Sequence, residues 1–171
     1  MAVTFYKIAT VTVGSGGAST IEFTSIPQTY TDLQIALSAR GTSTALYARA
    51  EINGNAGTNY SLKTIYGEGS GGTASQNDAN TTYFDRFLMN SSAYTANTFS
   101  NAIMYIPNYT SSNKKCLMFD SVDETNATAA PMYMVAGVWN QTSAITSIKF
   151  TPNTGNFAQY SSATLYGISN S

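Results

Sequence analysis

The sequence contains no histidine and a single cysteine, Cys116. One cysteine cannot form an intrachain disulfide. A zinc or copper site built from the usual nitrogen and sulfur ligands is also excluded within one chain. A Ser-His catalytic pair lacks its base. We therefore expect no metal site of this type, no cofactor and no catalytic residues of this class.

Charge is scarce as well. Charged residues make up 10% of the chain, eight basic and nine acidic, with a formal net charge of −1. A typical soluble domain has about 25% charged residues. Such a surface repels other copies weakly, so it tends to associate, and it lacks the basic face that nucleic acid requires. Two interpretations fit this composition: a neutral, threonine-rich β protein, or a surface made for neighbouring subunits.

Long hydrophobic runs are missing too. No apolar stretch approaches the roughly 20 residues that span a bilayer, and Met1 to Val13 alternates polar and apolar residues instead of forming a secretion signal. We expect no membrane association. A length of 171 residues favours one domain, 1–171, over two.

The residues that are present predict strands from end to end. Apolar residues alternate with polar ones at Thr20–Thr24, Asp32–Ser38 and Leu46–Ile52, a period of two that indicates half-buried strands. Further strands are expected at Ile103–Ile106, Cys116–Phe119, Met132–Val135, Ile148–Phe150 and Ala163–Ile168. The first three of these are apolar on both faces, so we expect them centrally in a sheet or beneath a partner subunit.

Turn-forming residues separate these segments. The turns are expected at Gly14–Gly17, Asn53-Gly54, Gly69–Gly72 and Asn153–Gly155, and the polar stretch Ser75–Thr82 is expected to be a longer loop. Roughly eight to ten short strands with such spacing predict an antiparallel, jelly-roll-like β-sandwich in a single domain.

Few residues suggest metal binding or catalysis. The segment Asp120-Ser121-Val122-Asp123-Glu124, followed by Asn126, is the main acidic cluster. It lacks the spacing and the glycine of the twelve-residue calcium loop, so a solvated turn is the preferred interpretation and a weak cation site the alternative. No motif supports a Ser-Lys pair with Lys63, Lys114, Lys115 or Lys149, or paired carboxylates among Glu51, Glu68 and Asp85. We predict that the chain is not an enzyme.

Aromatic residues are the better candidates for contact. Twelve tyrosines and one tryptophan offer rigid area with a polar tip, a composition enriched at protein interfaces. Most of the tyrosines are expected in the core and on sheet faces. Tyr94, Tyr109 and Tyr160, which lie beside polar segments, and Trp139 are the predicted interface residues. The two-sided strands at Ile103–Ile106 and Met132–Val138 are the predicted covered surface.

Several segments, taken together and in order, resemble structural proteins of tailed bacteriophages. Ile21 to Leu33 resembles their opening motif, a strand, a Ser-Ile-Pro turn and a Tyr-Thr-Asp-Leu strand. Ile52–Ser61 looks like the loop that follows, and Ile106–Tyr109 is similar to a middle strand. Ala144–Ile148 and Leu165–Ile168 resemble the last two strands. The resemblance covers most of the chain and implies no catalytic residues.

The resemblance implies a non-enzymatic virion structural protein. The leading expectation is a capsid decoration or cement protein, which binds the major capsid protein and copies of itself, as a homotrimer, at the capsid surface. The chain has no fibre repeat or coiled-coil heptads, which favours this role over a fibre segment. The alternative is a tail-fibre or receptor-binding module that recognises host surface glycan.

Overall fold

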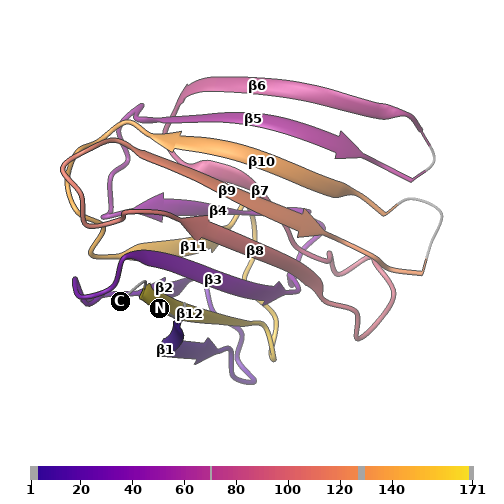
Figure 1. The fold of residues 1–171 in the computed structure, drawn as a ribbon. Helices are drawn as coiled ribbons and strands as arrows, with labels where there is room; N and C mark the ends of the chain where they lie inside the picture. The colour runs from indigo at the N-terminus through magenta and orange to yellow at the C-terminus, as the bar shows by residue number, and fades with distance from the viewer. Residues whose placement is uncertain (1–3, 70, 127–129, 170–171) are drawn as a thin grey trace.

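The computed structural model describes residues 4–69, 71–126 and 130–169, and within these ranges it contains twelve strands and no helix (Figure 1). No helix there could serve as a membrane span. The strands are β1 (Thr4–Thr12), β2 (Ile21–Phe23), β3 (Asp32–Ala39), β4 (Tyr47–Ile52), β5 (Tyr60–Gly67), β6 (Thr73–Thr81), β7 (Phe84–Leu88), β8 (Ser100–Ile106), β9 (Lys115–Val122), β10 (Met132–Trp139), β11 (Ile148–Pro152) and β12 (Ser162–Ser169).

The strands form two antiparallel sheets of unequal width. The larger sheet has the order β1-β12-β3-β8-β9-β10-β5-β6, and the smaller has the order β2-β11-β4-β7. Figure 1 shows the larger sheet spread from β6 at the top to β1 at the bottom, with the smaller sheet behind it. The strand β7 lies against β5, β8, β9 and β10, while β2 lies against β1 and β12. The antiparallel β-sandwich predicted from the sequence is confirmed.

Alternation along the strands builds the core between the sheets. Leu33, Ile35 and Leu37 on β3 are buried, and Gln34 and Ala36 between them are only partly covered. Across the sandwich, Phe87 of β7 stacks on Phe119 of β9 with ring centroids 4.1 Å apart. This aromatic pair joins the two sheets near the middle of the core.

Three expectations about single elements can now be compared with the structure. The two-sided strands do lie centrally, because β8, β9 and β10 are interior strands of the larger sheet. Asn53 and Gly54 both have positive φ, as the predicted turn requires. Within the predicted turn 69–72, Ser70 lies outside the described residues.

The expectation of a loop at Ser75–Thr82 is wrong. Residues 73–81 form β6, an edge strand paired only with β5. Nearly every residue of β6 is exposed on both faces, so no apolar alternation marks it in the sequence. Strands β1, β5 and β7 were also missed, and the described residues therefore contain more strands than the eight to ten expected.

One position of β12, Gly167, has no room for a side chain. A Cβ atom built on Gly167 would lie 2.3 Å from Cγ and Cδ2 of Tyr30, whose ring covers this position of the sheet. The Tyr30 ring also packs against Tyr6 of β1 at 5.6 Å between centroids. Only glycine leaves room for this ring.

We predict that Gly167→Ala lowers the free energy of unfolding by about 1–3 kcal/mol, because the added methyl group displaces a packed ring. Urea denaturation monitored by tyrosine fluorescence measures the change. Gly67→Ala is the matched control, since Gly67 is also in a strand of the larger sheet and its Cβ position is open. An equal loss in both variants would contradict the role of the Tyr30 ring.

Candidate functional site

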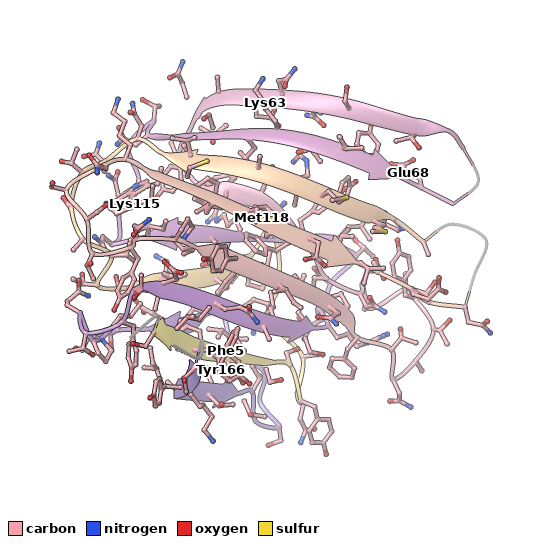
Figure 2. The ribbon with its side chains drawn as sticks, in the orientation of Figure 1. Phe5, Lys63, Glu68, Lys115, Met118 and Tyr166 are labelled. Carbon is pink, nitrogen blue, oxygen red and sulfur yellow. The ribbon has the colours of Figure 1, made fainter. Side chains whose placement is uncertain are left out.

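The outer face of the larger sheet carries an exposed apolar surface. Five large side chains there are between 39% and 58% exposed, and we call this surface the methionine face: Ile65 on β5, Ile103 on β8, Met118 on β9, and Met132 and Met134 on β10. It uses three of the six methionines of the chain. Figure 2 looks onto this side of the sheet and labels Met118 near its centre.

Strand alternation produces the methionine face directly. On β10, Tyr133 and Val135 point into the core, so Met132 and Met134 must point outward. Cross-strand pairing then gathers the outward residues, with Met134 opposite Ile65 of β5 on one side and Asp120 of β9 on the other. Side chains that are far apart in the sequence therefore form one patch.

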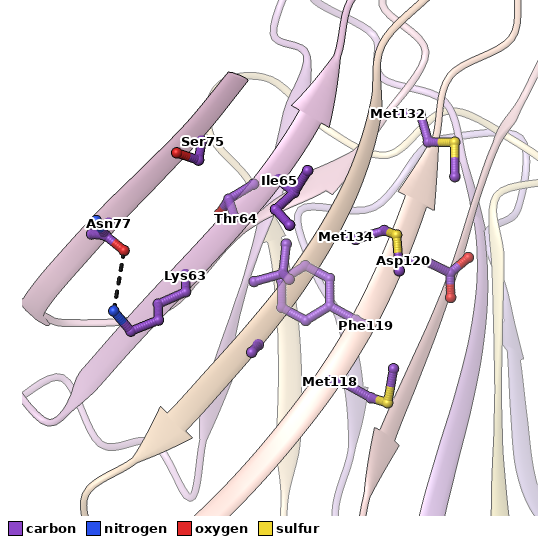
Figure 3. A pocket seen from close by; sticks show the side chains of 12 residues that line it. Lys63, Thr64, Ile65, Ser75, Asn77, Met118, Phe119, Asp120, Met132 and Met134 are labelled. Atoms are coloured by element: carbon purple, nitrogen blue, oxygen red, sulfur yellow. Dashed lines mark hydrogen bonds between the residues drawn. The ribbon is translucent and has the colours of Figure 1, made fainter. Parts of the chain in front are cut away.

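The methionine face is hollowed at one side. A groove of about 640 Å³ runs over β6, β5, β10 and β9, and its walls include Ile65, Met118, Met132 and Met134 (Figure 3). Methionine is unbranched and adapts its shape to a neighbour. Exposed apolar patches of this kind mark interaction surfaces in soluble proteins.

Two opposite charges flank the methionines. Lys63 of β5 and Asp120 of β9 are both exposed, and β10 lies between their strands. The Lys63 ammonium donates a hydrogen bond to Asn77 Oδ1 at 3.3 Å, as Figure 3 shows. Neither residue takes part in a salt bridge within the described ranges.

The outer face of the smaller sheet has a different character. There Lys149 of β11 lies in register between Glu22 of β2 and Glu51 of β4, and its Nζ is 2.8 Å from Glu51 Oε2. Arg49 adds a longer contact to the same carboxylate at 3.9 Å. Lys149 and Arg49 thus both have an acidic neighbour on this face, whereas the exposed methionine and isoleucine side chains lie on the larger sheet.

Serine hydroxyl groups fasten β7 to the inner side of the larger sheet. The Leu88 N–H donates to Ser121 Oγ, and Ser100 Oγ donates to the Leu88 carbonyl, each at 2.6 Å. All three residues are buried. Hydrogen bonds in this dry interior hold the last residue of β7 to both β8 and β9.

A buried carboxyl group lies two residues beyond Ser121. The Asp123 side chain is fully buried, and neither carboxyl oxygen has a hydrogen-bond partner. Burial is the main cause that raises the pKa of Asp123 to about 6; the charge of Glu124 acts in the same direction and Arg40 in the opposite one. In the folded chain this carboxyl group is therefore largely protonated below about pH 6.

The acidic segment does not converge on one point. Asp120 points to the outer face, Asp123 is buried, and exposed Glu124 accepts a hydrogen bond from the Asn126 N–H at 2.6 Å. Among the residues described, no group of three or more His, Cys, Asp or Glu side chains is placed to hold a metal ion.

The predicted contact aromatics fall into two groups. Tyr109 and Trp139 are 0% and 1% exposed and belong to the core, which removes both from the surface open to a partner. Their bulk and apolarity suit a core position as well as an interface, and the sequence does not separate the two. Tyr160 is 69% exposed, and Tyr94 is half-buried. The Tyr94 carbonyl accepts a hydrogen bond from Arg40 Nη2 at 3.2 Å.

Several of the residues considered for catalysis have structural partners. The Lys115 ammonium is buried and donates to the carbonyl oxygens of Ser111, at 2.7 Å, and Asn113, at 2.5 Å. Burial lowers the pKa of Lys115. Arg86 of β7 contacts both Asp85 and Asp78 of β6, which ties the edge strand to the smaller sheet. Burial raises the pKa of Asp85.

Sequence reasoning found part of this surface. The predicted covered ranges contain Ile103, Met132 and Met134, but Lys63, Ile65 and Asp120 were not connected with them. The missing information is the pairing of β5 with β10, which depends on strands that are more than sixty residues apart in the chain.

Comparison of the chain with protein-family profiles, with curated proteins and with solved structures found no match.

Asp123 makes the stability of the fold depend on pH. Its pKa is about 6 in the folded chain against an ordinary value of 3.8, so between these values the folded state binds the extra proton. The free energy of unfolding therefore falls as pH rises through this window and stays lower above it, by on the order of 3 kcal/mol.

We predict that Asp123→Asn removes this loss and unfolds in more urea than the parent chain at pH 7.5, while the difference shrinks or reverses at pH 4.5. Urea unfolding at the two pH values measures both effects. Glu22→Gln, at an exposed position of β2 in the smaller sheet, is the control and should keep the pH dependence of the parent chain. Parallel pH profiles for parent and Asp123→Asn would contradict the role of this carboxyl group.

Proposed function

We propose that this chain is a non-enzymatic structural subunit of a tailed-bacteriophage particle, and that it decorates or cements the capsid. Its partners are the major capsid protein and other copies of the chain. The methionine face is the surface that a neighbouring subunit covers.

The exposed methionine face is the observation that carries this proposal. The core between the sheets is closed by residues such as Phe87, Phe119 and Phe150, and the outward methionines are not part of it. Transfer of apolar area from water is favourable by about 25 cal/mol per Å². A neighbour that covers this face gains that free energy, which is the physical basis of a cement contact.

Two features of the sequence support the same role. The ordered resemblance to phage structural proteins covers Ile21 to Ile168. The net charge of −1 over 171 residues allows many copies to lie close together on one particle with little repulsion. A decorating subunit resists expansion of a DNA-filled shell in proportion to the area that it buries across each junction.

Tyr160 supports a second candidate function. Its ring is 69% exposed and projects from the connection between β11 and β12, where φ of Tyr160 is 71°. An exposed aromatic ring is a platform on which a sugar can stack. A tail-associated module that recognises host surface glycan would use such a residue.

The test is cryo-EM of the phage particles whose genome encodes this chain, compared with particles that lack the gene. We expect density for the sandwich repeated over the icosahedral lattice, and earlier DNA release on heating when the chain is missing. Re-addition of the purified chain should restore heat resistance, whereas the Met134→Asp variant should not. Ser112→Asp, which adds the same charge at an exposed position in the β8–β9 connection, is the matched control and should restore heat resistance.

Other outcomes of the cryo-EM experiment distinguish the two candidate functions. A few copies at the tail would contradict the cement role and favour attachment. In that case sugars that bind should raise the melting temperature of the chain, and Tyr160→Ala should abolish the rise. Absence of the chain from purified particles would contradict both functions.

A further inference from the structure

The methionine face is complementary in charge to itself. Its apolar centre is flanked by one cation, Lys63, and one anion, Asp120, on opposite sides of β10. In register, Lys63 lies opposite Ala136, and Asp120 lies opposite Met134, which is two residues away from Ala136 along β10. Figure 3 shows Lys63 and Asp120 on either side of Met134.

We propose that the occupant of this face is the same face of a second copy of the chain. The two faces pack together about a two-fold axis that lies in the plane between them. This symmetry repeats every contact twice, so Lys63 of each copy meets Asp120 of the other.

The register fixes where the axis passes. Lys63 and Asp120 are separated by two strand spacings, about 9.6 Å, and by two residues along the strand, about 6.8 Å. A two-fold axis that exchanges their positions must cross the line between them at its midpoint and at a right angle. It therefore passes beside Ala136 and Met134 of β10, so the methionines of β10 lie near the axis, with Lys63 on one side of it and Asp120 on the other.

The same geometry gives the crossing angle of the two sheets. An axis placed in this way lies about 35° from the strand direction, so the strands of the two copies cross at about 70°. This angle lies between the aligned class of sheet packing, at about 30°, and the orthogonal class, at about 90°. The hollow over β6, β5, β10 and β9 lies beside the axis.

The area is sufficient for a specific but moderate contact. The strands β5, β10, β9 and β8 are each seven or eight residues long, and together they present a face of about 19 Å by 27 Å. Each copy would bury on the order of 500 Å², or about 1,000 Å² for the pair, which is the minimum for a specific interface and falls in the class of weak, reversible contacts. The net charge of −1 opposes such pairing very little.

This inference deepens the proposed function by naming the occupant of the face, yet it can fail separately, because pairing is a property of the purified chain. A monomeric chain that still decorates the capsid would overturn the inference and leave the proposed function standing. A chain that forms the dimer but is absent from phage particles would support the inference and contradict the proposed function.

The experiment is sedimentation velocity of the purified full chain from micromolar to submillimolar concentration. We expect a reversible dimer. Lys63→Asp brings two carboxylates together at each margin, and Asp120→Lys brings two ammonium groups together there, so each variant should dimerise at least about tenfold more weakly. Lys114→Asp, an exposed charge change in the β8–β9 connection, is the matched control and should dimerise like the parent.

Mixing the two variants gives the decisive readout. One copy then offers two carboxylates and the other two ammonium groups, so both margins are complementary and a heterodimer should form with the affinity of the parent pair. The double variant Lys63→Asp/Asp120→Lys should also recover dimerisation by itself. Recovery in either form shows that the single variants are folded, so weak pairing of each alone is a charge effect.

The proposal is overturned if the chain stays monomeric at every concentration or associates into trimers through a head-to-tail contact. It is also overturned if the chain forms a dimer whose affinity is unchanged by both single charge reversals. Failure of the mixture and of the double variant to recover pairing would overturn it as well.

Discussion

The mismatch in width between the two sheets determines the rest of this structure. Eight strands face four, and the smaller sheet covers only the inner side of the larger one. The outer side of β5, β8, β9 and β10 is therefore left to solvent, and β6 extends beyond the cover as an edge strand exposed on both faces. Because strand residues alternate in direction, each buried residue of β10 is matched by an outward one, and the outward residues at its start are methionines. The candidate contact surface follows from the sandwich geometry together with that choice of side chain.

The interior divides into a dry aromatic centre and a polar end. Phe87, Phe119 and Phe150 pack together in the centre, whereas Ser100 and Ser121 bind the backbone of Leu88 and lead to the buried carboxyl group of Asp123. The hydroxyl groups are satisfied and give β7 a definite register against β8 and β9. The carboxyl group of Asp123 has no such partner. Its charged form is therefore unfavourable in the interior, and the free energy of unfolding depends on pH.

Local sequence patterns predicted the sandwich and several strands. The alternation of Leu33, Ile35 and Leu37 predicts β3, and Asn53-Gly54 predicts a turn with positive φ. The edge strand β6 escaped prediction because both of its faces are polar. Tyr109 and Trp139 were expected at an interface, yet they lie in the core, since a large aromatic side chain serves either place. Of the candidate site, the sequence indicated the two-sided strands around Ile103 and Met134 but not the charges beside them.

The sequence by itself determined the all-β class, the low charge and the absence of the histidine and cysteine pairs that most catalytic and metal sites require. Those properties depend on composition and on residues that are near one another in the chain. Only the tertiary structure decided which apolar face is covered and which is exposed. That outcome depends on strand neighbours such as β5 with β10 and β3 with β12, which are distant in sequence. It also brought Lys63 and Asp120 to opposite sides of β10 within one patch, because cross-strand register, and not chain order, places side chains on a sheet.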